Sequence, residues 1–375
     1  MSNDLLLDFD PNIWSADSVH SESTLHQLSP YVGKMKSTVA KILIEKYSKP
    51  NDTILDPFVG SGTIALESLI LKRNIICYDI NPYSIILTRA KLNPLKSESI
   101  AINKIKLYLS ESKELTTKID VNEIPQWLKK LYHPQTLLET VAFSKLLLQN
   151  HEYFLLASLL GILHHQRPGF LSFPSSHSIP YLRDKKFPLK KYPELYTYRD
   201  LESRIYKKIK RVYKRIPTID DTLIRTCEQK NVLNIDLPKD SIDTIITSPP
   251  YMDTLDYYRD NRVRLWFCGI EYKNKELYPN PKNVNEFKKL VSNMLTIFNN
   301  ILKSDGKCIL VIGDVNKEDN NKIINTGKIV MKILEEDDNF TMDGYFKDVM
   351  IKIKRNLNSN LKQKEEWIIV SRKRK

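Results

Sequence analysis

The 375-residue chain contains no apolar run near the roughly 18 residues that a membrane-spanning helix requires. Its first ten residues, MSNDLLLDFD, lack the basic segment that opens a signal peptide, so we expect no secretory signal. The four cysteines, Cys77, Cys227, Cys268 and Cys308, are far apart and show neither CxxC nor Cys/His spacing. Disulfides and a zinc site are therefore not expected, and the reducing cytoplasm is the predicted location.

Glycine is also scarce, with only 10 residues, whereas charged residues are abundant. Lysine and arginine number 58 against 45 aspartates and glutamates, which gives a formal net charge of +13. A charge of this sign favours a polyanionic partner such as nucleic acid. The length and an apolar content of 41% allow one large domain, or a core domain with a substantial insertion.

Two of the few glycines, Gly60 and Gly62, follow a short apolar segment that ends at Asp56. The pattern predicts a helix over 36–47, then a strand, a glycine-containing turn and a second helix over 64–72. A turn of this kind directs backbone N–H groups and a helix N-terminus at a ligand. It is not a phosphate-binding P-loop, since no Lys-Ser/Thr follows the glycine, and it does not have GxGxxG spacing.

A second strand is predicted over 74–78, ending at Asp79, and Asn81-Pro82 opens a helix that reaches about Leu92. An acidic residue at this point, roughly 20 residues after the glycine turn, is positioned to accept hydrogen bonds from ribose hydroxyls. The alternative is that Asp79 only caps the following helix.

The alternation of strand and helix stops between about 95 and 230. Apolar periodicity predicts helices over 137–149 and 153–163, followed by a long loop over 164–177. That loop contains His164, His165 and His177, but no carboxylate or cysteine accompanies them at ligand spacing, so no metal site is expected.

Residues 183–215 hold 13 lysines and arginines against four acidic residues, with five tyrosines interleaved. Apolar positions within 204–216 share one face of a helix and leave a basic face outside. Such a helix binds phosphates by charge and bases by stacking, although a merely solvated charged helix has the same pattern. The expected nucleic-acid contacts are Arg183, Lys185, Lys186, Arg204, Lys207, Lys208, Lys210, Arg211, Lys214 and Arg215.

Strands and helices alternate again in the last third. Strands are predicted over 232–235, ending at Asp236, over 242–247 and over 307–312. Helices are predicted over 287–302 and near 323–336, and two final strands near 342–352 and 366–371. The basic residues 372–375 are expected to fray.

The segment Ser248-Pro249-Pro250-Tyr251 directly follows the strand predicted over 242–247. Two successive prolines fix φ near about −65° and remove two N–H donors, so the chain must leave the sheet as a stiff loop. Hydroxyl and carbonyl acceptors beside an aromatic ring suit a flat heterocycle with an exocyclic amine. Alone, the motif could equally be a strand terminator with a packing tyrosine.

With both motifs in view, the chain resembles the amino-group-directed, S-adenosylmethionine-dependent DNA methyltransferases. The segment 56–63 is similar to their DPF.GSGT motif, and 248–251 to their catalytic (D/N/S)PP(Y/F) motif. The resemblance covers about 25–94 and 230–372 and implies an α/β fold, a Rossmann-like seven-stranded sheet with a mainly helical insertion. The expected organisation is an N-terminal arm over 1–24, a catalytic domain over 25–96 and 229–375, and a DNA target-recognition domain over 97–228.

The resemblance also implies roles for individual residues. Asp56 and the glycine turn hold the methionine part of S-adenosylmethionine, Asp79 the ribose, and Asp236 resembles the acidic residue near the adenine amine. Tyr31 and Lys34 resemble the segment that closes over the methionine end. The complete implied cofactor set is Tyr31, Lys34, Asp56, Phe58, Gly60, Ser61, Gly62, Thr63, Asp79, Ile80 and Asp236, and the catalytic set is Ser248, Pro249, Pro250 and Tyr251.

The implied reaction moves a methyl group to the exocyclic amine of a base flipped out of double-stranded DNA, without a metal. Serine in the first motif position favours cytosine N4, with adenine N6 as the alternative. Carbon-5 methylation is not expected, because no cysteine follows a proline. An RNA amine methyltransferase and a non-catalytic DNA-binding protein remain as competing hypotheses. A cognate restriction endonuclease or a phage-defence partner is a possible associate.

Overall fold

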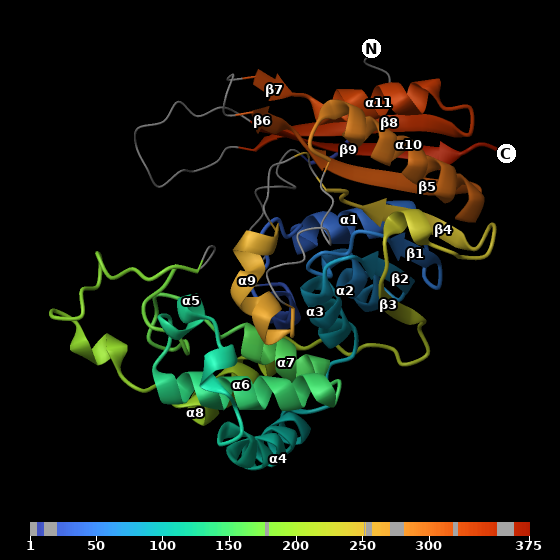
Figure 1. Cartoon of the computed structure of the whole chain (residues 1–375). Helices are drawn as coiled ribbons and strands as arrows, with labels where there is room; N and C mark the ends of the chain where they lie inside the picture. Colours follow the sequence, from blue (N-terminus) through green and yellow to red (C-terminus); the bar gives the residue numbers. More distant parts are fainter. Residues whose placement is uncertain are drawn as a thin grey trace.

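The computed structural model describes residues 6–10, 21–176, 180–250, 252, 257–270, 281–317, 322–350 and 364–375. In Figure 1 a twisted sheet with its covering helices fills the upper part of the molecule, and a group of helices lies below it. No helix in the described ranges combines the length and apolarity needed to cross a membrane.

Seven strands form one sheet in the order β3-β2-β1-β4-β5-β9-β8. The first five are parallel, and β9 runs antiparallel to both of its neighbours. The predicted α/β class with a Rossmann-like seven-stranded sheet is therefore confirmed. The strands are β1 (Thr53–Asp56), β2 (Asn74–Asp79), β3 (Arg225–Gln229), β4 (Ile242–Thr247), β5 (Leu302–Gly313), β8 (Phe340–Met350) and β9 (Lys364–Lys373), and a separate hairpin joins β6 (Val315–Lys317) to β7 (Lys322–Ile324).

Helices cover both faces of the sheet, as a mainly parallel sheet requires. One face packs against α1 (Ser37–Tyr47), α2 (Thr63–Ile70) and part of α3 (Pro82–Leu92). The other packs against α10 (Val284–Ile301) and α11 (Thr326–Glu336), with Phe287, Phe298 and Met331 fully buried. Local capping starts α3, because the Asn81 side chain accepts the Tyr83 N–H at 3.0 Å and Pro82 occupies the first turn.

The lower group of helices, called the helical half below, has its own apolar core. It comprises α4 (Glu98–Thr116), α5 (Gln126–Lys129), α6 (Pro134–Gln149), α7 (Tyr153–Leu160) and α8 (Leu201–Val212). Its core also contains residues from outside 97–228: Leu25 and Leu28 near the 3₁₀ helix η2 (Thr24–Gln27), Tyr83 on α3, and Val263 on α9 (Tyr257–Phe267). The core of the helical half is therefore completed by segments assigned to the catalytic domain.

Two assignments near the end of the insertion were wrong. Residues 225–229 form the sheet strand β3, which the sequence analysis placed in the insertion; this edge strand is mostly polar and partly exposed, so it lacks an apolar pattern. The strand expected over 232–235 is instead the 3₁₀ helix η6 (Val232–Asn234), which Asn231 caps by accepting the Leu233 N–H at 3.0 Å. The helix α9 was not foreseen.

Both chain ends contact the sheet more closely than expected. Within the arm, the Leu7 N–H donates to the Tyr345 carbonyl at 2.9 Å, and Phe9 packs on the Phe346 ring at 5.3 Å. The basic tail does not fray along its length, since Arg372 and Lys373 belong to β9 and pair with its neighbouring strands. Lys373 also forms an ion pair with Asp240 at 2.6 Å.

The helical half packs closely on the segment around η2 at Gly161. A Cβ at this position would lie 2.1 Å from the Leu28 carbonyl oxygen and 3.0 Å from the Lys208 Nζ. Because that backbone cannot give way cheaply, Gly161→Ala should lower the free energy of unfolding by about 1–3 kcal/mol in urea titrations.

Gly169→Ala is the matched control, since a Cβ there meets nothing within 4 Å. It should change the free energy of unfolding by less than about 0.5 kcal/mol. Equal stability of the two variants would contradict the close packing of Gly161.

Candidate functional site

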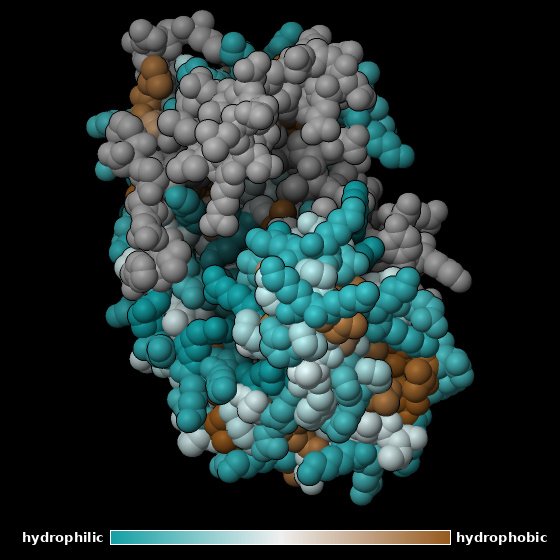
Figure 2. Space-filling model, turned by 90° about the vertical axis from the view of Figure 1, so that its left-hand side faces the viewer, coloured by the Kyte–Doolittle hydropathy of each residue, from teal (hydrophilic) through white to brown (hydrophobic). Residues whose placement is uncertain are grey.

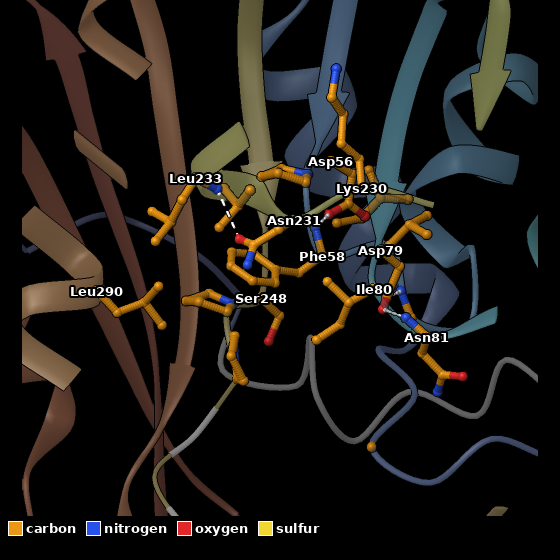
Figure 3. Close-up of a pocket in the computed structure, with 18 of the residues that line it drawn as sticks. Asp56, Phe58, Asp79, Ile80, Asn81, Lys230, Asn231, Leu233, Ser248 and Leu290 are labelled. Atoms are coloured by element: carbon orange, nitrogen blue, oxygen red, sulfur yellow. Dashed lines mark hydrogen bonds between the residues drawn. The ribbon is translucent and has the colours of Figure 1, made fainter. Parts of the chain in front are cut away.

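A cavity of about 350 Å³ lies at the carboxyl ends of β1, β2 and β4, the edge at which open α/β sheets bind ligands. Six segments supply its walls, within residues 31–35, 56–64, 79–81, 230–233, 248–250 and 281–293. Figure 3 shows Asp79, Ile80 and Asn81 on one side, Leu290 on the opposite side, and Phe58 and Ser248 between them. Its size is within the range of small-molecule sites.

Eleven of the residues singled out from the sequence line this one cavity, although they come from four separate parts of the chain. Tyr251 lies outside the described residues, and three others, Lys34, Gly62 and Asp236, are not among the lining residues. The lining members are Tyr31, Asp56, Phe58, Gly60, Ser61, Thr63, Asp79, Ile80, Ser248, Pro249 and Pro250.

The three departures have local explanations. Gly62 has φ +70° and packs on α3, where a Cβ would lie 2.6 Å from the Thr88 hydroxyl. The Lys34 Nζ donates to the His26 carbonyl at 2.9 Å. Asp236 is exposed and follows η6. The adjacent strand already ends at Gln229, so Lys230 and Asn231 take the place at its carboxyl end and line the cavity.

Asp56 ends β1 and is almost completely buried. Its Oδ1 accepts the Thr247 hydroxyl at 2.7 Å, across from the end of β4, and the Phe58 N–H at 3.3 Å. Burial raises the pKa of Asp56 to about 7, although both hydrogen bonds act in the opposite direction. The cavity wall thus contains a carboxyl group that changes charge near neutral pH.

Asp79 ends β2 and ties two turns together. Its Oδ2 accepts the Gly60 N–H at 2.8 Å, and its Oδ1 accepts the Asn81 N–H at 2.8 Å. Burial raises the pKa of Asp79 to about 6, while these backbone hydrogen bonds lower it. The side-chain cap of α3 is Asn81, not Asp79, so the alternative that Asp79 serves as that cap does not hold.

Buried polar side chains lie behind the glycine turn, and one of them is bonded to it. Lys91 is fully buried on α3 and its Nζ donates to the Ser61 carbonyl. His26 and Glu67 form a second buried contact, with Nε2 and Oε1 2.6 Å apart. Burial lowers the pKa of Lys91 well below its ordinary value and raises the pKa of Glu67 to about 7. The Ser61 carbonyl in the glycine turn is therefore bonded by a lysine whose charged form burial disfavours.

Sequence reasoning missed one wall of the cavity. Glu286, Lys289, Leu290 and Asn293 lie at positions i, i+3, i+4 and i+7 of α10 and line the cavity together. Their spacing marks one helix face, but only the packing of α10 on the sheet decides that this face meets the cavity. Lys230, Asn231 and Leu233 were also missed, because β3 was not recognised.

The histidines and cysteines lie apart from this cavity. His164 is buried with its Nδ1 3.0 Å from the Ser176 carbonyl, and His165 stacks on the Phe170 ring, whereas His177 is outside the described residues. In the described part of the chain no group of three or more His, Cys, Asp or Glu side chains could hold a metal ion. All four cysteines are buried and free.

The basic residues singled out for nucleic acid divide into two groups. Lys208 is buried, donates to the Gln27 carbonyl at 3.0 Å and cannot reach a phosphate; burial lowers its pKa to about 7, so its expected role was wrong. Arg183 and Arg204 are half-buried. Arg183 donates a hydrogen bond to the Gln166 side chain, and Arg204 donates to the Asp200 and Pro168 carbonyls. The exposed members are Lys185, Lys186, Lys207, Lys210, Arg211, Lys214 and Arg215.

The family model and the two curated proteins that match this chain are all described as methylases or methyltransferases. Residues 10–88 match the DNA methylase family N6_N4_Mtase. The chain is 29% identical to the Type II methyltransferase M.MjaII of Methanocaldococcus jannaschii over 108 residues, which cover 28% of this chain and 20% of that protein. It is 25% identical to the Type II methyltransferase M.BsoBI of Geobacillus stearothermophilus over 285 residues, covering 68% of this chain and 54% of that protein. The matches thus span about a fifth and about half of these relatives.

Two solved structures also align with the chain. TrmN from Thermus thermophilus has a TM-score of 0.38 and 11% identity, covering 93% of this chain and 52% of that one. A SAM-dependent methyltransferase from Methanosarcina mazei has a TM-score of 0.35 and 11% identity, covering 88% of this chain and 97% of that one.

The bond between Thr247 and Asp56 predicts a pH-dependent stability effect. Asp56 has a higher pKa folded than unfolded, so folding binds a proton between about pH 4 and 7 and stability falls as the pH rises through that window. The hydrogen bond from the Thr247 hydroxyl stabilises the ionised form of Asp56 more than its protonated form. Thr247→Val should therefore cost about 2 kcal/mol of unfolding free energy at pH 8 and about 1 kcal/mol at pH 6 in urea titrations.

Thr247→Ser keeps the hydroxyl and should show little difference between the two pH values. A valine penalty that is the same at pH 6 and pH 8 would exclude the proposed titration of Asp56.

Proposed function

We propose, from the match of residues 10–88 to the DNA methylase family, that this chain transfers a methyl group from S-adenosylmethionine to an exocyclic amine of a base in DNA. One observation carries the proposal: the glycine turn and Asp79 line a single cavity together with the Ser248-Pro-Pro loop, which follows them by more than 150 residues of sequence. A cofactor turn and an amine-accepting loop on one wall are what direct methyl transfer requires.

The cavity fits S-adenosylmethionine by its chemistry. Two carboxyl groups in its wall, the buried Asp56 and the half-buried Asp79, suit a ligand that carries a sulfonium cation and ribose hydroxyls. The N-terminus of α2, at Thr63 and Ile64, lines the same cavity and suits the carboxylate of the methionine part. When bound, the cofactor supplies an electrophilic methyl group.

Apolar and amide side chains suit the adenine ring. Ile80 and Leu290 stand on opposite sides of the cavity in Figure 3, with Leu233 and Asn231 above the space between them. We assign the adenine to this space, in place of the role that the sequence analysis gave to Asp236. Tyr31 contributes to another wall, where its ring approaches Gly60 and stacks on Tyr83 with centroids 5.8 Å apart.

The Ser248 hydroxyl and the Pro249 carbonyl would accept the two N–H groups of the target amine. That pairing favours a pyramidal nitrogen and directs its lone pair at the methyl group, so positioning and electrostatics suffice. The loop begins at a fixed point, since Thr247 is bonded to Asp56. We assign Tyr251 to stacking on the flipped base, although it lies outside the described residues.

We favour cytosine N4 as the acceptor because serine stands in the first position of the motif, with adenine N6 as the alternative. The net charge of +13 and the exposed basic residues of α8 support double-stranded DNA as the partner. Type II methyltransferases are the named relatives, so a restriction endonuclease that reads the same site is the proposed cellular counterpart. An RNA amine substrate and a non-catalytic scaffold are the competing functions.

Nucleoside mass spectrometry of duplex DNA treated with the protein and S-adenosylmethionine tests the function. We expect N4-methylcytosine; N6-methyladenine would correct the base, and no methylated nucleoside would contradict the function. Ser248→Ala should lower turnover by about 10²–10³-fold, the usual effect of losing one positioned hydrogen-bond group. Ser292→Ala, on the exposed side of α10, is the control and should retain wild-type turnover.

Cofactor affinity should depend on pH through Asp79, whose pKa is about 6. A cationic ligand prefers the ionised carboxylate, so the dissociation constant should fall as the pH rises from 5 to 7.5. Asp79→Asn should weaken binding at pH 7.5 by about tenfold, equivalent to about one pKa unit, and in calorimetry should remove the part of the pH dependence centred near pH 6. The part centred near pH 7, which belongs to Asp56, should remain. Asp236→Asn, outside the cavity, should retain the wild-type profile. Identical profiles for wild type and Asp79→Asn would remove Asp79 from the site.

A further inference from the structure

Residues 183–197, called the finger below, form a loop between the core of the helical half and α8. In Figure 1 this light-green segment projects from the left-hand side of the helical half. Its tip is a tight turn, because the Lys191 and Tyr192 N–H groups both donate to the Pro188 carbonyl at 3.0 Å. Leu189 and Lys190 therefore stand at the apex, and Leu189 is 57% exposed.

A single exposed leucine is common on protein surfaces and has no significance alone. Here the supporting loop is braced from inside. The Phe187 and Tyr192 rings pack edge to face at 5.8 Å, and the Tyr196 hydroxyl donates to the Phe187 carbonyl at 2.6 Å. Tyr196 in turn packs on Phe173 at 5.1 Å, which joins the finger to the body of the helical half.

The base of the finger is also held. Arg199, which follows it, is buried and donates to the Phe170 and Leu195 carbonyls, each at 2.8 Å. A loop that is ordered before its partner arrives loses little further conformational entropy on binding. These contacts hold the base and the sides of the finger, and the leucine at its apex remains exposed.

Lysines surround the apolar tip. Lys185, Lys186, Lys190 and Lys191 are all exposed, and the finger holds five basic residues against two acidic ones. The Lys186 and Lys191 Nζ atoms lie 5.7 and 5.5 Å from the centroids of the Phe187 and Tyr192 rings, respectively. The face of the helical half that is turned to the viewer in Figure 2 is mostly hydrophilic, with several separate apolar patches.

We propose that the finger enters a groove of double-stranded DNA, where Leu189 contacts the bases while Lys185, Lys186, Lys190 and Lys191 contact the flanking phosphates. The proposal rests on the proposed function and specifies how the DNA is engaged. An apolar side chain that contacts base steps between flanking cations is the chemistry by which proteins penetrate a duplex groove. The lysines favour a polyanionic partner. The narrow apolar apex favours insertion into a groove over contact with the phosphates alone.

The test separates the apolar contact from the ionic ones. Binding of the full chain to a 30-base-pair duplex, about three helical turns, is measured by fluorescence anisotropy over a series of salt concentrations. Leu189→Ala should weaken binding about threefold to tenfold without changing the slope of log affinity against log salt, because an apolar contact releases no counterions. The double variant Lys190→Ala, Lys191→Ala should flatten that slope by about 1.8, or about 0.9 for each phosphate that is no longer neutralised.

Leu107→Ala is the matched control, since Leu107 is 56% exposed on α4, and it should bind as wild type does. Wild-type affinity of Leu189→Ala, or an unchanged slope in the lysine variant, overturns the proposal. Tighter binding to single-stranded RNA of equal length, with the same weakening on Leu189→Ala, also overturns it in favour of RNA.

Methyl transfer is scored on the same duplex so that the two proposals can fail separately. Expected binding effects without any methylated product contradict the function and leave the groove contact supported. Methylation with both variants binding as wild type overturns the groove contact alone.

Discussion

The parallel pairing of β1 with β4 is the constraint on which the site depends. It sets Asp56 and Thr247, 191 positions apart in sequence, within a 2.7 Å hydrogen bond at the carboxyl edge of the sheet. From these two strand ends the chain leaves in two loops, the glycine turn and the Ser248-Pro-Pro segment, that bound one cavity. The proximity of the glycine turn and the Ser248-Pro-Pro segment therefore follows from strand register, and no loop has to fold over a long distance to achieve it.

Burial at this edge has an electrostatic cost that the fold meets with hydrogen bonds. Asp56 is buried and Asp79 half-buried, and this desolvation raises the pKa of each, yet each accepts at least two hydrogen bonds that favour ionisation. The balance leaves both carboxyls close to titration at neutral pH. A cationic ligand would complete that balance, so the same burial that lowers the stability of the empty fold strengthens a sulfonium contact.

The sequence predicted well what is determined locally. The turn around Gly60, the cap at Asn81 and the double proline each specify their backbone within a few residues, and the cavity formed around them. It failed where tertiary packing decides. The edge strand ending at Gln229 has polar residues on its open side, so Asp236 was taken as a strand end. The cavity-lining face of α10 is one of several polar faces until the helix is docked on the sheet.

The shared core of the helical half limits how independently this part of the molecule can move relative to the cavity. Two hydrogen bonds join the segment around η2 to α8. The Thr24 hydroxyl donates to the Val212 carbonyl at the end of α8, and the Lys208 Nζ donates to the Gln27 carbonyl. A few residues later the same segment lines the cavity at Tyr31. A displacement of α8 by bound DNA would have to move this segment or break these buried bonds, and buried hydrogen bonds are costly to lose. The helical half is therefore joined through these contacts to the cavity wall at Tyr31, and grafting it onto another sheet would expose the Leu25 side of its core.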